Sequence, residues 1–133
     1  MTVLVVDAAN VVGSRPDGWW RDRAGATERL LGRLRTLPGS TLDGPDGPLD
    51  CTGVVAVVEG RARDVPAPDG VRVVRATGSG DDALVECVTQ LTGDGVEMLV
   101  VTADRGLRAR LPGVAVTGPG WLLDRLDRTD GPA

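Results

Sequence analysis

Runs of apolar residues that do not alternate with polar ones mark the strands that the sequence predicts. Five such β-favouring segments lie at residues 3–6, 54–58, 71–75, 98–102 and 114–117. An apolar run without alternation is typical of a strand buried on both faces, as in a parallel sheet that helices cover. The first run leads directly into Asp7, so this carboxylate falls at the carboxyl end of the strand. We expect that strand to be central, although Asp7 and Asn10 could equally form only the turn that leaves it.

Leucines at helical spacing lie between several of these strands. The residues after Asn10 are expected to form a loop that ends at Trp19 and Trp20. A helix is expected to follow as far as about Leu37, with the two tryptophans at its start packed in the core. Further helices are expected from residues 78–82 to Leu91, shortly after residue 102, and from Pro119 to residue 126. We expect residues 38–53 to be a turn-rich connection and residues 127–133 to fray.

The alternation of strands and helices predicts the fold class. It indicates an α/β protein with three α/β/α layers, Rossmann-like, around a mostly parallel sheet of about five strands. We expect residues 1–126 to form a single domain and residues 127–133 to be its tail, since 133 residues suffice for one buried core. No repeat or internal domain boundary is visible.

The composition excludes several kinds of chemistry. The chain has no His, Lys, Tyr or Phe, and all 15 basic residues are Arg. A Ser-His-Asp triad, a His-ligated zinc, a Schiff-base lysine and a Walker-type lysine are therefore excluded. Carboxylates suit hard cations such as Mg²⁺ and Mn²⁺, and the chain has 15 Asp and 4 Glu. The net charge of −4 argues against strong nonspecific binding of nucleic acid.

No apolar run is long enough to span a bilayer, and residues 3–6 are too short for the core of a signal peptide. We therefore expect a cytoplasmic protein that does not bind a membrane. Cys51 and Cys87 are expected to be reduced thiols, because two such cysteines predict neither a disulfide framework nor a zinc site.

Polar residues gather where the predicted parallel strands end and the following helices begin. These residues are Asp7, Asn10, Glu59, Ser79, Asp81, Asp82, Thr102, Asp104 and Arg105. Carboxylates that converge on one edge repel each other unless a cation lies among them, which favours a divalent metal. Each residue also has a purely structural interpretation, since Ser79 with Asp82 resembles a capping box and Asp104 could cap a short helix. Arg21 and Arg23 lie near a helix start and are candidates for phosphate contact.

Three segments resemble the landmarks of PIN-like nuclease domains. They are Val-Val-Asp7-Ala-Ala-Asn10, Gly80-Asp81-Asp82-Ala83-Leu84-Val85-Glu86 and Val101-Thr102-Ala103-Asp104-Arg105-Gly106-Leu107. They occur in the expected order over nearly the whole chain, and the Asp-x-x-Asn opening is closer to the NYN branch. The third segment, which follows a hydrophobic strand, is the most specific of the three.

The resemblance implies a ribonuclease that depends on Mg²⁺ or Mn²⁺ and acts on an RNA substrate in the cytoplasm. Asp7, Asp82 and Asp104 would be its metal ligands, and Asn10 would position the metal water or the substrate phosphate. One further acidic ligand is expected, and the candidates are Asp22, Glu28 and Glu59. Asp22 is preferred because it is expected near the edge of the sheet where the other carboxylates gather. Asp81 would be a secondary ligand or a helix cap. The substrate phosphate would contact residues from the set Arg21, Arg23, Arg105, Ser79 and Thr102, with Thr102 also supporting the site.

Other interpretations remain open. Residues 78–83 match the Gly-x-Gly-x-x-Gly/Ala dinucleotide fingerprint, but Asp81 and Asp82 would repel a pyrophosphate there. A haloacid-dehalogenase-like phosphatase needs an Asp-x-Asp pair, and Ala9 stands at the second position. A metal-dependent nucleotide pyrophosphohydrolase and a non-catalytic PIN-like binding module are both compatible with the acidic cluster. A homodimer, a protein partner and a toxin–antitoxin role are compatible with the resemblance, but no residue argues for them.

Overall fold

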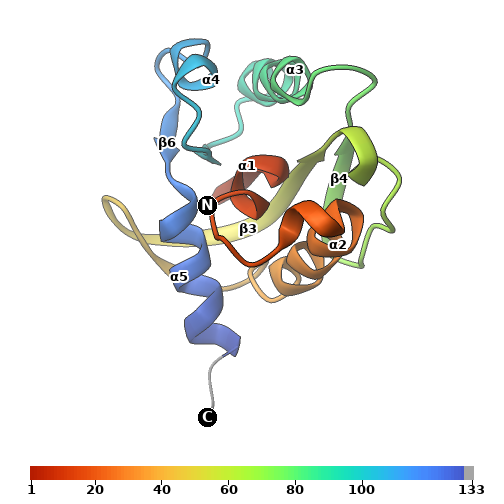
Figure 1. Cartoon of the computed structure of the whole chain (residues 1–133). Coiled ribbons are helices and arrows are strands. Elements are labelled where there is room, and N and C mark those ends of the chain that lie inside the picture. Colours follow the sequence, from red (N-terminus) through yellow and green to blue (C-terminus); the bar gives the residue numbers. More distant parts are fainter. Residues whose placement is uncertain (131–133) are drawn as a thin grey trace.

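A mostly parallel sheet with helices on both faces forms the protein (Figure 1), whose computed structural model describes residues 1–130. The parallel strands follow the spatial order β4 (Val71–Arg75), β3 (Gly47–Val58), β1 (Thr2–Asp7), β5 (Met98–Val101) and β6 (Ala115–Thr117). β1 is hydrogen-bonded on both sides, and Leu4, Val5 and Val6 are fully buried. The predicted central position of the first strand is confirmed.

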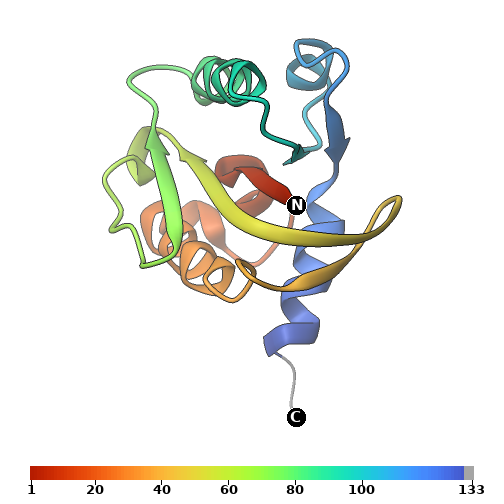
Figure 2. The ribbon, with the colours of Figure 1, turned by 180° about the vertical axis from the view of Figure 1, so that it is seen from behind.

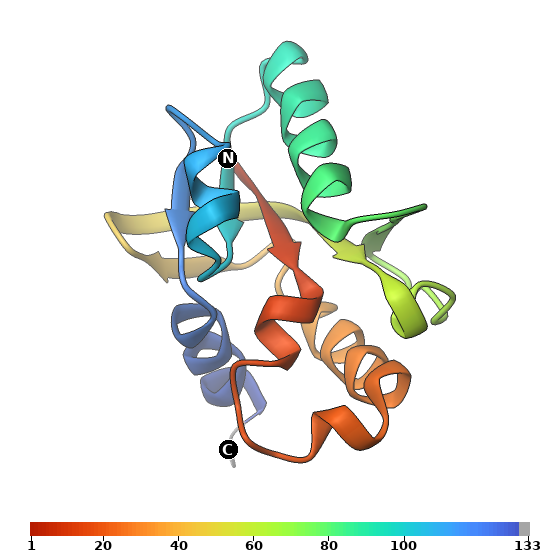
Figure 3. The same ribbon diagram turned by 45° about the horizontal axis from the view of Figure 1, so that its top comes forward.

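Two helical layers cover the sheet, as Figures 1 and 3 show. One layer consists of α1 (Ala8–Val12), α2 (Arg23–Leu34) and α5 (Pro119–Asp130), and the other of α3 (Gly80–Gly93) and α4 (Arg105–Ala109). Alternate side chains of β1 serve the two layers, since Leu4 and Val6 pack with the first group and Val5 with the second. The predicted three-layer α/β/α fold is confirmed. Among the described residues, no helix is long and apolar enough to cross a membrane.

A β-hairpin occupies most of the segment that the sequence predicts to be a turn-rich connection. β2 (Thr41–Gly44) pairs antiparallel with the first residues of β3, which begins at Gly47 rather than at residue 54. Figure 2 shows this hairpin extending from the sheet towards α5, where the Trp121 indole N–H donates to the Asp43 carbonyl at 2.9 Å. The prediction of an irregular connection was wrong, because its Gly and Pro residues form the hairpin turn and its flanks.

The segment after Asp7 also differs from the expectation. α1 forms where a loop was expected after Asn10, and Asp7 caps it by accepting from the Asn10 N–H at 3.4 Å. Trp19 and Trp20 lie in a separate 3₁₀ turn, η1 (Trp19–Arg21), and α2 begins only at Arg23. The expectation that both tryptophans are core residues was wrong, since Trp20 is 53% exposed and Trp19 is half-buried. They precede the amphipathic part of the helix, so its spacing does not direct them inward.

Helix α5 continues to Asp130, so residues 127–130 of the expected frayed tail are helical, while residues 131–133 lie outside the described part of the chain. Asp127 forms ion pairs with Arg15 at 2.8 Å and Arg33 at 2.7 Å. Hydrogen bonds from these two arginines lower the pKa of Asp127 to about 2. These contacts tie the helix to the loop after α1 and to α2, which accounts for its extension.

Candidate functional site

The carboxyl ends of β1, β3 and β5 bring four carboxylates to one edge of the sheet. Asp7 ends β1, Glu59 follows β3, Asp104 follows β5, and Asp81 lies in the first turn of α3. We call these four residues the acidic rim. Parallel strands direct their carboxyl ends to the same edge, which is where open α/β sheets place their ligand sites. The sheet therefore gathers residues from sequence positions nearly one hundred residues apart.

Thr102 connects two members of the acidic rim. Its side chain is fully buried, and its hydroxyl donates to Asp7 Oδ2 at 2.9 Å. The same hydroxyl oxygen accepts from the Asp104 backbone N–H at 3.1 Å. Asp104 in turn caps α4, because its Oδ1 accepts from the Leu107 N–H at 2.9 Å. The structure therefore places Thr102 in a supporting position, with both Asp7 and Asp104 held by short polar contacts.

Asn10 makes a second connection between β1 and β5. Its side-chain oxygen accepts from the Ala103 backbone N–H at 2.8 Å. Because Asn10 lies one turn along α1 from Asp7, this bond fixes the start of α1 against the loop that carries Asp104. The side-chain NH₂ group remains available to an oxygen of a substrate or water.

The start of α3 is occupied by protein groups. The Glu59 carboxylate accepts a hydrogen bond from the Gly80 N–H, and Ser79 Oγ accepts from the Asp82 N–H at 3.3 Å. A Cβ at position 80 would meet the Glu59 carboxylate, so a larger residue there would displace the end of the glutamate side chain. A pyrophosphate has no free place at this helix start, which argues against the dinucleotide fingerprint. Ser79 acts as a cap.

The two adjacent aspartates of α3 have different surroundings. Asp82 forms an ion pair with Arg110 at 2.8 Å, and its side chain is 71% exposed. Asp81 is half-buried, and its pKa is raised by burial first and then by the nearby carboxylates of Asp104 and Glu59. The structure thus places Asp81 within the acidic rim and turns Asp82 towards Arg110, whereas the sequence resemblance had favoured Asp82.

Burial and nearby carboxylates disfavour ionisation of two members of the acidic rim, Asp7 and Asp81. Burial is the largest cause of the raised pKa of Asp7; the Thr102 hydroxyl and the Asn10 N–H lower it, while Asp81 and Glu59 raise it further. Burial also raises the pKa of Asp81, with Asp104 and Glu59 adding to the effect and Arg110 opposing it. Closely placed carboxylates with raised pKa values are a common feature of functional sites.

The oxygen donors of the acidic rim are of the kind that Mg²⁺ and Mn²⁺ prefer, and their repulsion is what a cation would relieve. Within residues 1–128, however, no three His, Cys, Asp or Glu side chains lie close enough together to hold a metal ion as they stand. The chemistry of the donor set therefore fits a hard cation, and the ligand set is not assembled in advance.

The remaining candidate residues are not members of the acidic rim, although Arg23 lines a pocket together with Glu59. Asp22 caps α2 by accepting from the Gly25 N–H at 2.9 Å, and Glu28 is exposed on α2. Of the three residues that competed for the last acidic position, the structure places Glu59 among the carboxylates. Arg21 and Arg23 lie with the two tryptophans at the start of α2, and Arg105 is exposed in the first turn of α4.

Two features of the site have no clear signal in the sequence. Arg110 is the ion-pair partner that draws Asp82 away, and nothing in its local sequence indicates this pairing. The contact between Glu59 and Gly80 joins residues 21 positions apart. Gly80 could be noted in the sequence, but the close approach of the Glu59 carboxylate, which explains a glycine at that position, could not.

No family model matches the chain, and no curated protein matches it. Among solved structures, the chain is similar to Rae1 (YacP) from Bacillus subtilis, with a TM-score of 0.72 and 16% sequence identity. The match covers 96% of this chain and 75% of Rae1. The W164L mutant of Rae1 gives a TM-score of 0.66 at 16% identity, covering 96% and 76%. At this identity the likeness concerns the fold, which is consistent with a PIN-like domain.

Proposed function

We propose that the chain is a ribonuclease that hydrolyses RNA phosphodiesters with a Mg²⁺ or Mn²⁺ ion held at the acidic rim. The observation that carries the proposal is geometric: the strand ends bring four carboxylates to one edge of the sheet. Burial raises the pKa of Asp7 and Asp81 there, and the neighbouring carboxylates add to the effect. Repulsion between carboxylates in a folded protein is relieved when a cation binds among them. The PIN-like fold and the three sequence segments support RNA as the substrate.

The roles follow from the contacts. Asp7, Asp81 and Asp104 would hold the metal, with Glu59 as a further ligand once it leaves the Gly80 N–H. When bound, the metal would supply a water of lowered pKa and offset charge on the phosphate. Thr102 holds Asp7 and Asp104 in place. Asn10, tied to Ala103 through its oxygen, directs its amide NH₂ to a phosphate oxygen or a water. No imidazole is needed for this chemistry.

The adjacent aspartates of α3 provide a matched test. Labelled single-stranded and structured RNAs would be incubated with Mn²⁺, Mg²⁺ or EDTA, using wild type, Asp81→Asn and Asp82→Asn. Both substitutions remove one negative charge from the same helical turn, so the change in net charge is the same. We expect cleavage only with metal, a loss of at least 100-fold in Asp81→Asn, and activity within a few-fold of wild type in Asp82→Asn. Asp7→Asn and Asp104→Asn should behave like Asp81→Asn.

A non-catalytic PIN-like binding module is the second candidate. It is favoured by the fact that no three potential ligands within the described residues stand at metal-binding distance, with Glu59 already engaged by α3. Absence of cleavage of every RNA, together with no binding of Mn²⁺, would support it. Binding of Mn²⁺ without RNA cleavage would instead direct attention to nucleotides, as expected of a pyrophosphohydrolase.

A further inference from the structure

An exposed tryptophan lies beside the candidate site. Among the described residues, the exposed large hydrophobic side chains are Met1 and Trp20, and Trp20 is 53% exposed. Its ring makes an edge contact with Trp19, with centroids 6.0 Å apart and planes at 88°. Tryptophan is usually buried or found at interfaces, because its ring carries a large apolar surface. An indole that is exposed to solvent is therefore suited to binding a flat apolar group.

Three arginines surround this tryptophan. Trp20, Arg21, Asp22, Arg23, Ala24 and Arg61 line one pocket of about 430 Å³, which we call the Trp20 pocket. The guanidinium of Arg21 lies 6.0 Å from the Trp20 ring centroid. Among the side chains of residues 1–128, no carboxylate forms an ion pair with Arg21, Arg23 or Arg61. The one carboxylate that lines the pocket, Asp22, caps α2. The pocket is therefore locally basic in a protein of net charge −4.

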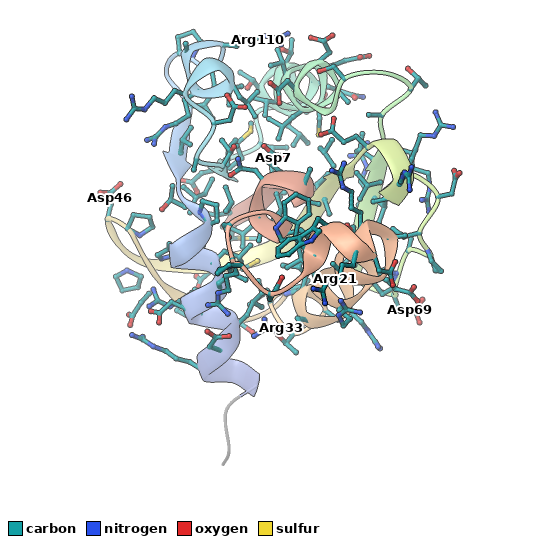
Figure 4. All side chains as sticks on the ribbon, in the orientation of Figure 1. Asp7, Arg21, Arg33, Asp46, Asp69 and Arg110 are labelled. Carbon is teal, nitrogen blue, oxygen red and sulfur yellow. The ribbon has the colours of Figure 1, made fainter. Side chains whose placement is uncertain are left out.

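The Trp20 pocket leads to the acidic rim. A neighbouring pocket of about 400 Å³ shares Arg23 and Arg61 with it and is also lined by Trp19, Ala9 and Glu59. Glu59 belongs to the acidic rim, and Ala9 lies in α1 between Asp7 and Asn10. Figure 4 labels Asp7 above α1 and Arg21 beside the start of α2. The two adjoining pockets thus connect Trp20, through Arg23 and Arg61, to Glu59 of the acidic rim.

We propose that the Trp20 pocket binds single-stranded RNA next to the cleavage site, with one base stacked on Trp20 and the adjoining phosphates on Arg21, Arg23 and Arg61. This inference rests on the proposed ribonuclease function and specifies its substrate class. Bases in a duplex are already stacked on each other, so a base face is available to an indole only in a single strand. The combination of arginines for phosphates and an aromatic ring for a base is the usual composition of single-strand binding surfaces.

Binding can be measured without cleavage. Anisotropy of a fluorescein-labelled 12-nucleotide single strand in EDTA, at low salt, would compare wild type, Trp20→Ala and Trp20→Phe. We expect Trp20→Ala to weaken binding by roughly 5- to 150-fold, and Trp20→Phe to retain most of the affinity. Binding of the same sequence as a duplex should be weaker and unaffected by Trp20→Ala. Equal affinity of wild type and Trp20→Ala, or equal losses for single strand and duplex, would overturn the inference.

The arginines are tested by salt dependence. The double variant Arg23→Ala/Arg61→Ala should reduce the slope of log affinity against log salt by about 1.4, since each phosphate contact to a single strand contributes about 0.7. Arg35→Ala/Arg72→Ala removes the same charge from exposed positions outside both pockets and is the matched control. Trp20→Ala should leave the slope unchanged. Equal slopes for the two double variants would contradict the assignment of the arginines.

The outcomes separate this inference from the proposed function. If wild type binds single-stranded RNA through Trp20 but cuts nothing with Mn²⁺ or Mg²⁺, the binding surface stands and the nuclease proposal fails. If wild type cleaves RNA while Trp20→Ala binds and cleaves it with unchanged KM, the nuclease proposal stands and the inference fails. Circular dichroism melts of each variant exclude misfolding as the cause of any loss.

Discussion

Replacing Thr102 by Val tests whether its hydroxyl holds the site together. The side chain is fully buried, and its hydroxyl bonds both Asp7 Oδ2 at 2.9 Å and the Asp104 N–H at 3.1 Å. Val has nearly the same shape, so the substitution removes the hydroxyl without opening a cavity. A hydrogen bond to a charged group contributes about 1.5–3 kcal/mol, and leaving a backbone N–H without an acceptor adds roughly 1 kcal/mol. We expect a loss of about 3 kcal/mol in the free energy of unfolding, or about 10 °C in Tm.

Thr102→Ser is the control, because it keeps the hydroxyl and loses one methyl group, at a cost of about 1 kcal/mol. Urea unfolding followed by tryptophan fluorescence, at pH 7.5 in EDTA, would measure all three proteins. The hydroxyl lowers the pKa of Asp7 by favouring its ionised form. The deficit of Thr102→Val should therefore be full where Asp7 is ionised and shrink as pH falls and Asp7 becomes protonated. A Val variant as stable as the Ser variant would refute this role of Thr102.

Three further substitutions test separate parts of the account. Asp127→Asn should lower Tm at pH 7, and the difference from wild type should vanish as pH falls through about 2. The reason is that a pKa lowered to about 2 contributes stability only while Asp127 is ionised. Thermal melts of both proteins over pH 2–7 measure this difference. Asp81→Asn should raise Tm in EDTA at pH 7, and its Tm should equal that of wild type below about pH 4. The raised pKa of Asp81 means that ionising this side chain destabilises the folded state. An unchanged Tm at pH 7 would contradict this prediction. Trp121→Phe should speed hydrogen exchange in residues 41–50 and cost up to about 1 kcal/mol, because it removes one of the two donors to the Asp43 carbonyl and leaves Arg125 Nη1 as the other. Unchanged exchange would show that the Trp121 bond does not hold the hairpin.

The sheet was predictable because its signal is local. The run Val3–Val6 is apolar on both faces, and in the structure Val5 packs against α3 and α4 while Leu4 and Val6 pack against the other layer. The hairpin was not predictable by the same means. Its first strand is short and lies at the sheet edge, and Gly47-Pro48 at the start of β3 contains the residues that normally end a strand. Pairing with β2, rather than an apolar run, defines that part of β3.

The acidic rim was predictable only in outline. Strand ends follow from the apolar runs, so the convergence of Asp7, Glu59 and Asp104 could be expected. Which of Asp81 and Asp82 faces the rim depends on how α3 is rotated, and Arg110, a residue from beyond α4, pairs with Asp82. Exposure of Trp20 likewise depends on where α2 begins, and one turn of helix decides it. Such choices rest on tertiary contacts that no local pattern records.

Uptake of Mn²⁺ by the metal-free protein tests the central claim most directly, since it requires no knowledge of the RNA. Electron paramagnetic resonance would measure free Mn²⁺ during titration of wild type, Asp81→Asn and Asp82→Asn. The account predicts one Mn²⁺ site in wild type, its loss or a weakening of at least tenfold in Asp81→Asn, and retention in Asp82→Asn. Failure of wild type to bind Mn²⁺, or equal binding by wild type and Asp81→Asn, would contradict the assignment of a metal to the acidic rim.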